Sequence, residues 1–235
     1  MSRQPLALLP GLLLTGRLWD AQREALADIA DIWLADFTTQ DSVTRMAEDV
    51  LAAMPPTFAL AGLSMGGYVA QEIVRLAPGR VTRLALLDTK ARPDDSDTAA
   101  RRRGLMDLAR RGQFKGVTPR LLPLLLHPDR LDDGPLRDAV MQMAEEVGLD
   151  AFLRQQQAIL DRPDYRPLLA RIGCPTLVLC GDRDQLTPPE VHRELAAGIR
   201  SARLVVVEGA GHLPPLERPA DTSTALRRWL LTDEG

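Results

Sequence analysis

The chain has 235 residues, 45% of them hydrophobic and 26% charged, which is typical of a globular protein with one main domain. A formal net charge of −3 and an aromatic content of 4% argue against nucleic acid as a partner. If the apolar run between Cys174 and Cys180 is a strand, the two thiols lie roughly 20 Å apart and cannot form a disulfide. We therefore expect a cytoplasmic protein, and no run reaches the ~18 apolar residues that a membrane span needs.

Short apolar runs alternate with amphipathic stretches over the first 90 residues, a pattern that favours βαβ units and a mostly parallel sheet. Apolar residues recur at helical spacing between 43 and 54. The stretch 65–76 also reads as a helix, ended by Pro78 and Gly79. Strands are predicted over residues 6–9, 31–37, 57–63 and 81–87.

The pattern changes between residues 91 and 166, where helical stripes run between Pro and Gly breaks and no strand is predicted. Strands return over 176–180 and 203–207, and a closing helix begins near Pro219. We therefore predict an α/β core over residues 1–90 and 167–235, with a helical cap inserted over residues 91–166.

A candidate nucleophile lies in the segment Gly62-Leu-Ser-Met-Gly-Gly67, between a predicted strand and a predicted helix. A turn this tight strains the backbone at Ser64 and exposes its hydroxyl. Gly62 and Gly66 remove side chains that would collide across the turn. A chance Gly-x-Ser-x-Gly string is common, but this context favours a nucleophilic serine.

A serine hydroxyl needs a general base, and the chain has three histidines. His212 follows the last predicted strand, where open parallel sheets build their sites. His127 is expected at the surface or on a pocket wall, and His192, which lies among charged residues, is expected to be solvated. Asp88, Asp182 and Asp184 are all candidates for the acid that orients the base, and spacing alone does not choose between Asp182 and Asp184.

The order of these elements resembles the α/β-hydrolase superfamily over essentially the whole chain. In that family the acid loop usually reads Gly-x-x-Asp, which here selects Asp184, and the Gly-x-Gly-His loop selects His212. The resemblance implies that the backbone N–H groups of Leu12 and Met65 form the oxyanion hole. Pro10 stands where the family usually has histidine.

The resemblance also implies that the chain lacks the family's first two strands. Residues 31–37 would then form an exposed sheet edge, through which a homodimer could form. Within the family, the sequence is similar to small bacterial carboxylesterases, enol-lactonases and acyl-carrier methyl-ester esterases. No cofactor is implied, and no His, Cys and Asp cluster has the spacing of a metal site.

We therefore expect a serine hydrolase that cleaves an ester, lactone or thioester of a small to medium acyl group, with Ser64, His212 and Asp184 as its triad. The alternatives are a ligand sensor of the same fold with slow turnover and a cofactor-free perhydrolase. The run Arg101, Arg102 and Arg103 is expected to be a solvated face, or less often a dock for coenzyme A or an acyl carrier. At least two of the three residues Gln155, Gln156 and Gln157 are expected to be exposed.

Overall fold

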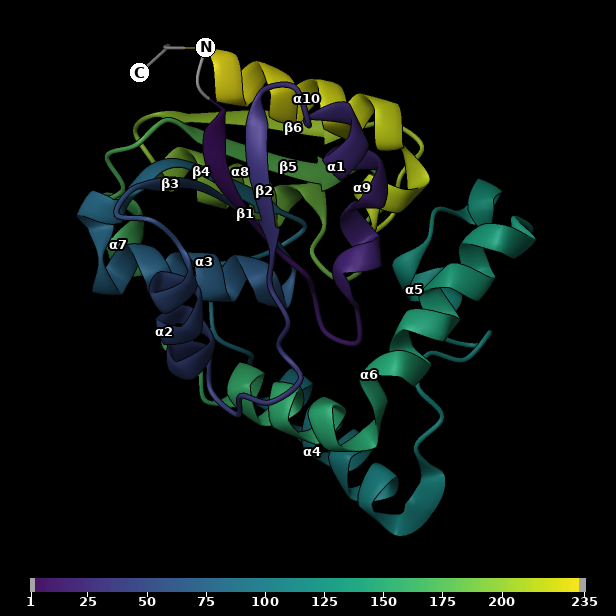
Figure 1. Ribbon diagram of the computed structural model, residues 1–235. Coiled ribbons are helices and arrows are strands. Elements are labelled where there is room, and N and C mark those ends of the chain that lie inside the picture. Colours follow the sequence, from purple (N-terminus) through teal and green to yellow (C-terminus); the bar gives the residue numbers. More distant parts are fainter. Residues whose placement is uncertain (1–2, 233–235) are drawn as a thin grey trace.

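A sheet of six parallel strands, in the order β2-β1-β3-β4-β5-β6, forms the centre of the computed structural model, which describes residues 3–232 (Figure 1). This arrangement confirms the predicted α/β class with a mostly parallel sheet. The strands are β1 (Gln4–Leu9), β2 (Ala30–Leu34), β3 (Phe58–Leu63), β4 (Val81–Leu87), β5 (Thr176–Gly181) and β6 (Ala202–Val207).

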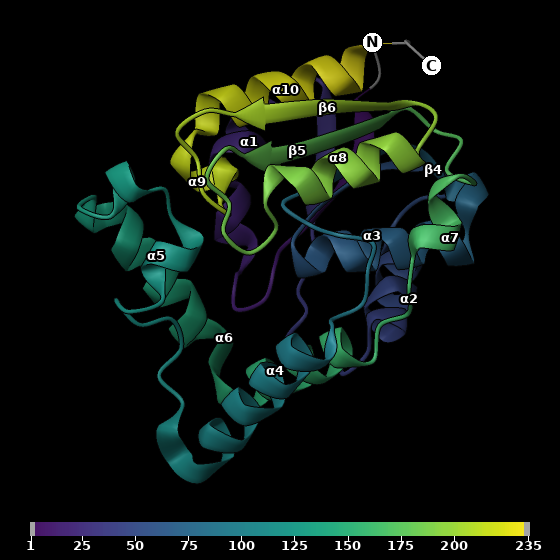
Figure 2. The same cartoon turned by 180° about the vertical axis from the view of Figure 1, so that it is seen from behind.

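Helices cover both faces of the sheet, as Figures 1 and 2 show from opposite sides. One face packs against α1 (Asp20–Ala25) and α10 (Pro219–Leu231), and the other against α2 (Val43–Ala53), α3 (Met65–Leu76) and α8 (Pro189–Gly198). Strand β1 illustrates why both faces are apolar: Leu6 and Leu8 enter one core, and Ala7 and Leu9 enter the other. Such strands, buried on both sides, read as continuous apolar runs.

The sheet ends at β2, which lies beside β1 only, so the predicted edge is present. The strand begins at Ala30 and ends at Leu34, earlier than the predicted range of 31–37. A turn explains its end, since the carboxylate of Asp36 accepts the backbone N–H of Thr38 at 2.9 Å. Dimerisation through this edge stays a prediction.

Between β4 and β5 the chain forms a helical cap with no strand between residues 91 and 166. Its longest helix, α6, bends at Gly148, whose φ of 75° is left-handed, so the cap has two arms (Figure 1). At its base, the N–H of Tyr165 donates to the carbonyl of Ala91 at 2.9 Å. The cap contains α4 (Ser96–Leu108), the π-helical turn η3 (Ala109–Gln113), α5 (Leu122–Leu125), η4 (Pro128–Arg130) and α6 (Gly134–Leu160).

The remaining short helices connect these parts, namely η1 (Gly16–Trp19), η2 (Pro78–Arg80), α7 (Arg166–Leu169) and α9 (Pro214–Glu217). Cys180 is buried, Cys174 is half-buried, and both thiols are free. Over residues 3–232, no helix is both long and apolar enough to cross a membrane.

Candidate active site

Ser64 occupies the turn between β3 and α3, with a φ of 55° and a ψ of −114°. A non-glycine residue in this region costs on the order of 1–3 kcal/mol and persists only where its surroundings hold it. Two hydrogen bonds supply that support. The N–H of Ser64 donates to the carbonyl of Leu87 at 2.9 Å, and the hydroxyl of Thr89 donates to the carbonyl of Ser64 at 2.8 Å.

Close backbone contacts require the two glycines of the turn. A Cβ on Gly62 would lie 2.2 Å from the carbonyl oxygen of Gly66, and a Cβ on Gly66 would lie 2.3 Å from that of Leu9. No side chain fits at such distances, so the turn needs glycine at both positions. The turn thus brings Ser64 beside the loop that follows β1.

The structure brings Ser64, His212 and Asp184 together in a line of hydrogen bonds. Nε2 of His212 lies 2.9 Å from Oγ of Ser64, and Nδ1 lies 2.9 Å from Oδ2 of Asp184. The residues come from loops that follow β3, β6 and β5, so the carboxyl ends of three strands build the site. His212 and Asp184 are each about 3% exposed.

Asp184 is held as a carboxylate. Burial raises its pKa, but the charge of His212 and hydrogen bonds from His212 and Thr187 outweigh this effect and hold the pKa at about 2. Oδ1 accepts the backbone N–H groups of Leu186 and Thr187 at 2.8 and 3.0 Å, and Oδ2 accepts the Thr187 hydroxyl at 2.6 Å. An ionised acid at this place favours the tautomer of His212 whose Nε2 faces Ser64 as an acceptor.

The other two candidate acids make different contacts. Oδ1 of Asp182 accepts the backbone N–H groups of Gly209 and Ala210 at 2.8 and 3.2 Å, which ties the acid loop to the loop after β6. Asp88 is fully buried, and its Oδ1 accepts the N–H of Gly181 at 3.0 Å. Burial, together with the charge of Asp184, raises the pKa of Asp88 well above its usual value, which favours the neutral acid.

Ligand atoms of Asp88, Asp184 and His212 lie within 4.8 Å of one another, a spacing at which a metal ion could bind. Both ring nitrogens of His212 already contact hydrogen-bond partners, and both oxygens of Asp184 accept hydrogen bonds. The donor set therefore fits a proton-transfer relay better than a metal centre.

The loop after β1 places Leu12 beside the nucleophile. A Cβ on Gly11 would lie 3.2 Å from Cβ of Ser64, so the two turns are in contact. Gln155 of the cap holds this loop: its Oε1 accepts the N–H of Leu13 at 3.0 Å, and its Nε2 donates to the carbonyl of Phe37 at 3.0 Å. The N–H of Met65 opens α3, where the first N–H groups have no partner within the helix.

The prediction that at least two of the three glutamines are exposed is wrong. Gln155 is 1% exposed and Gln156 is 2% exposed, because Gln155 bonds to the loops after β1 and β2 and Gln156 lines the cavity. The side chain of Gln156 contacts Arg102. No sequence signal distinguished Gln155 from its neighbours, since its partners lie more than 100 residues away.

The prediction of a solvated His192 is also wrong, because its side chain is completely buried. Nε2 accepts the backbone N–H of Thr89 at 3.0 Å, and Nδ1 lies 3.3 Å from the carbonyl of Pro188. Burial lowers the pKa of His192 to about 4, so the ring is neutral at pH 7. His192 thus joins the acid loop to Thr89, which in turn supports the carbonyl of Ser64.

A cavity of about 650 Å³ lies between the cap and the strand ends, and Ser64 and His212 line it. Tyr68 and Phe152 line its wall. Part of its lining is apolar and exposed to solvent, namely leucines of α4, of the α5 region and of the acid loop that are 38–50% exposed: Leu105, Leu108, Leu121, Leu124 and Leu186.

Of the arginine run, Arg101 and Arg103 are exposed as predicted, whereas Arg102 turns inward. Arg102 lines the cavity and pairs with Asp94 at 3.0 Å. Asp94 also pairs with Lys90 and Arg162, so three cations share one carboxylate. The cations outnumber the acids in this cluster, which gives the cavity wall a positive charge.

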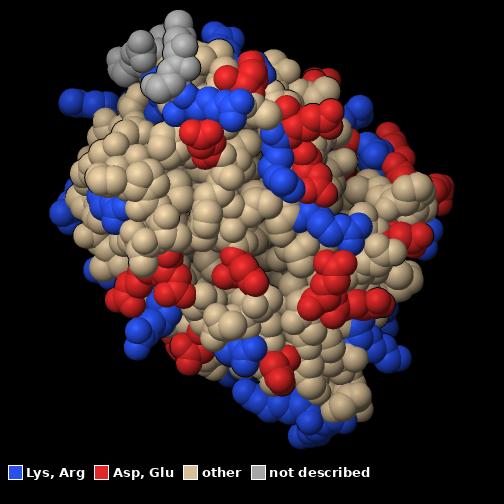
Figure 3. Space-filling model, in the orientation of Figure 1, with Lys and Arg blue, Asp and Glu red and all other residues tan. Residues whose placement is uncertain are grey.

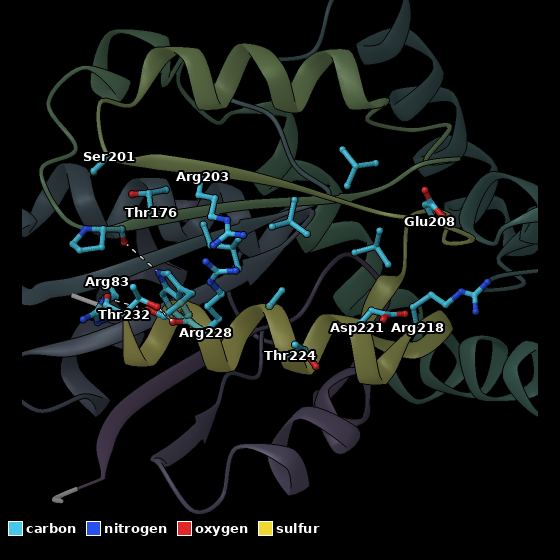
Figure 4. Close-up of a pocket in the computed structure, with 17 residues that line it drawn as sticks. Arg83, Thr176, Ser201, Arg203, Glu208, Arg218, Asp221, Thr224, Arg228 and Thr232 are labelled. Carbon is cyan, nitrogen blue, oxygen red and sulfur yellow. Dashed lines mark hydrogen bonds between the residues drawn. The ribbon is translucent and has the colours of Figure 1, made fainter. Parts of the chain in front are cut away.

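A second hollow of about 590 Å³ lies between β6 and α10, away from the cap (Figure 4). Arg203 and Arg228 extend into it, and Glu208, Arg218 and Asp221 lie at the other end. None of the three residues Ser64, Asp184 and His212 lines it. The candidate active site is therefore the cavity beneath the cap.

Comparison with known proteins shows the family of the chain. Residues 6–225 match the alpha/beta hydrolase family, and the chain belongs to that family. A pimeloyl-acyl-carrier-protein methyl ester esterase of Neisseria meningitidis is 31% identical over 201 residues, which are 83% of this chain and 77% of that protein.

Solved structures show the same architecture. A thermophilic esterase from Thermogutta terrifontis superimposes with a TM-score of 0.88 at 31% identity, over 97% of this chain and 90% of that one. An enol-lactonase from Burkholderia xenovorans superimposes with a TM-score of 0.89 over 99% of this chain and 93% of that one, but at 23% identity it supports the fold alone.

Proposed function

We propose that the protein is a serine hydrolase that cleaves carboxylic esters through an acyl-enzyme. The observation that carries this proposal is the line of hydrogen bonds from Ser64 through His212 to Asp184 on the floor of the cavity. Ser64 attacks the ester carbonyl while His212 accepts its proton. His212 then donates this proton to the leaving alcohol, and a water molecule activated by His212 releases the acid and frees Ser64.

Charge develops on the carbonyl oxygen in the tetrahedral intermediate, and we assign its stabilisation to the backbone N–H groups of Leu12 and Met65. The close approach of Gly11 to Ser64 supports the first assignment, and the position of Met65 at the start of α3 supports the second. Donors of this kind each contribute roughly 3 kcal/mol to transition-state binding.

Replacement of the nucleophile tests the proposal. Ser64→Ala should lower ester turnover by roughly 10³-fold or more, because the triad acts as a unit. A fluorophosphonate probe should label the wild-type protein and fail to label this variant. Ser96→Ala, at an exposed serine of the cap, is the matched control. Wild-type turnover in Ser64→Ala would refute the mechanism, and a very slow wild-type turnover would instead favour a ligand sensor.

The cavity favours an apolar acyl group of small to medium length, since Phe152 and several leucines line it. A series of p-nitrophenyl esters from acetate to dodecanoate should show kcat/KM rising with chain length and then falling once the chain extends beyond the cap. Lactones and thioesters of the preferred acyl group, assayed beside the ester, identify the bond that the enzyme cleaves.

An acidic acyl carrier is the partner that we propose for the cap. Figure 3 shows Lys and Arg side chains together at the tip of the cap. Helix α4, η3 and the segment after it supply exposed cations to the cap, namely Arg101, Arg103, Arg110, Arg111 and Lys115. The Neisseria relative is an esterase named for a carrier-bound ester. Opposite charges on two surfaces speed association and specify the partner.

Salt dependence tests this partner. Added salt should raise KM for an ester on an acyl carrier protein and leave KM for a p-nitrophenyl ester nearly unchanged. Arg103→Gln should raise KM for the carrier ester, and Arg200→Gln, at an exposed arginine outside the cap, is its control. The same KM for both variants would refute carrier docking at this surface, and a salt effect confined to a coenzyme A thioester would assign the surface to that smaller anion.

A further inference from the structure

Glu217 is a buried carboxylate that the triad does not use. It ends α9 and is 1% exposed, between the loop that holds His212 and the cap. Its Oε1 accepts the backbone N–H groups of Gly211 and Leu213 at 2.8 and 3.1 Å. These two residues flank His212, so Glu217 fixes the backbone on both sides of the base.

The other oxygen of Glu217 reaches the cap. Oε2 accepts the backbone N–H of His127 at 2.6 Å, just after α5. The guanidinium of Arg130, also in the cap, donates to the backbone carbonyl of Glu217. One side chain therefore contacts both the base loop and the cap.

The cap also contacts the base loop directly. The N–H of His212 donates to the carbonyl of Leu125 at 2.8 Å. A Cβ on Gly211 would lie 2.7 Å from the backbone nitrogen of His127, so the two backbones touch. Nothing can enter between the base loop and this part of the cap while these contacts persist.

We propose that Glu217 is a positioning residue that couples His212 to the cap, so that the segment 125–127 and the base loop move as one unit. This inference rests on the proposed function, because it gives a role to the support of its general base. A displaced base loop would lengthen the bonds that His212 makes to Ser64 and Asp184. Misplacement of a catalytic group by 1 Å costs about 100-fold in rate.

Variants of Glu217 test the positioning role. Glu217→Ala should lower kcat by about 100-fold and change KM less than threefold, because the substrate does not touch this residue. Glu217→Gln should retain more activity, since its amide oxygen can accept the two N–H groups that flank His212. Its amide nitrogen would then face the N–H of His127, donor against donor.

Position 127 allows one hydrogen bond to be removed from the backbone. His127 has a φ of −58° and Leu126 has a ψ of 149°, both compatible with proline at 127. His127→Pro deletes the N–H that Oε2 of Glu217 accepts, while His127→Ala keeps it. The proline ring also places its Cδ where that hydrogen lay, so it pushes Glu217 and the base loop away from the cap, and we expect the proline variant to be about tenfold slower than the alanine variant.

The double variant with Glu217→Ala measures the coupling. In the wild-type background His127→Pro removes the bond to Glu217 and crowds its side chain, but beside Glu217→Ala there is no bond to lose and the shorter side chain leaves room for the ring. We therefore expect His127→Pro to lower kcat much less in the Glu217→Ala protein than in the wild type. Loss of stability alone would lower the folded fraction by a similar factor in both backgrounds.

The proton on Nδ1 of His212, observed by NMR, reports the position of the base without turnover. Its resonance should shift in Glu217→Ala and exchange faster with water, because its bond to Asp184 lengthens. Wild-type kcat and an unchanged resonance in Glu217→Ala, or an equal effect of His127→Pro on kcat in the wild-type and Glu217→Ala backgrounds, would overturn the coupling. Absence of Ser64-dependent turnover in the wild type would instead overturn the proposed function.

Discussion

Acidification should weaken the fold through His192. The ring is completely buried, and its pKa falls from 6.5 to about 4, first because of burial. The charge of Asp184 and the carbonyl of Pro188 oppose that fall, and the nearby His212 adds to it. His192 therefore stays neutral in the folded chain at pH values where it is protonated in the unfolded chain.

The sign follows from proton uptake. Below pH 6.5 the unfolded state binds a proton that the folded state does not bind, so the free energy of unfolding decreases as the pH falls toward 4. A shift from 6.5 to about 4 corresponds to ~3 kcal/mol at 1.36 kcal/mol per pKa unit, the full amount being lost only below pH 4. The contribution of Asp184, whose pKa is about 2, is lost at lower pH, so the pH ranges in which His192 and Asp184 affect stability are separate.

Urea unfolding of the wild type and of His192→Gln, at a series of pH values from 7.5 to 4.5, measures the contribution of His192 to the free energy of unfolding. Glutamine can still accept the N–H of Thr89 but does not titrate. Asp88 and Glu217, whose pKa values are raised, oppose the trend equally in both proteins. The stability advantage of the wild type should shrink by about 2 kcal/mol by pH 4.5. If the free energies of unfolding of the two proteins differed by the same amount at every pH in this range, the reasoning would be refuted.

Two further predictions concern the chemistry. Asp184→Asn should lower turnover by about 10⁴-fold, because the amide favours the wrong tautomer of His212, whereas Asp88→Asn, which resembles the neutral acid, should cost less than tenfold. Steady-state kinetics would contradict this assignment if the Asp88 variant were the slower one. The side chain of Leu12 should exclude tert-butyl acetate while n-butyl acetate is hydrolysed, and Leu12→Gly should narrow the difference. Equal rates on both esters in the wild type would show that Leu12 does not border the oxyanion.

The sequence allowed prediction of those parts of the site that depend on neighbouring residues. Ser64 stands between a strand and a helix, and the glycines around it are required by contacts within the turn and with the adjacent strand. His212 and Asp184 follow strands whose carboxyl ends must meet in a parallel sheet. Their convergence therefore follows from topology, while their catalytic roles stay proposals.

The supports of the site could not be predicted in the same way. His192 lies beside Glu190, Arg193 and Glu194, so its surroundings in the sequence suggest solvent. In the fold its side chain is buried and accepts the N–H of Thr89, a residue 103 positions away that lies just after β4. Gln155 likewise accepts the buried backbone N–H of Leu13. Only the assembled fold shows which buried donors are left over.

The hydrogen bond between Tyr165 and Ala91 brings the two ends of the cap together where it leaves the core. Because these ends are adjacent, a cap of another length or sequence could replace this one without changing the register of any strand. The core would keep its chemistry while the exchanged segment altered the choice of substrate. Such an exchange has one restriction, since the new segment must still supply a backbone donor to Glu217 and an acceptor to the N–H of His212. A replacement cap without these two hydrogen bonds would keep the pocket of the protein it came from, but His212 beneath it would be misplaced.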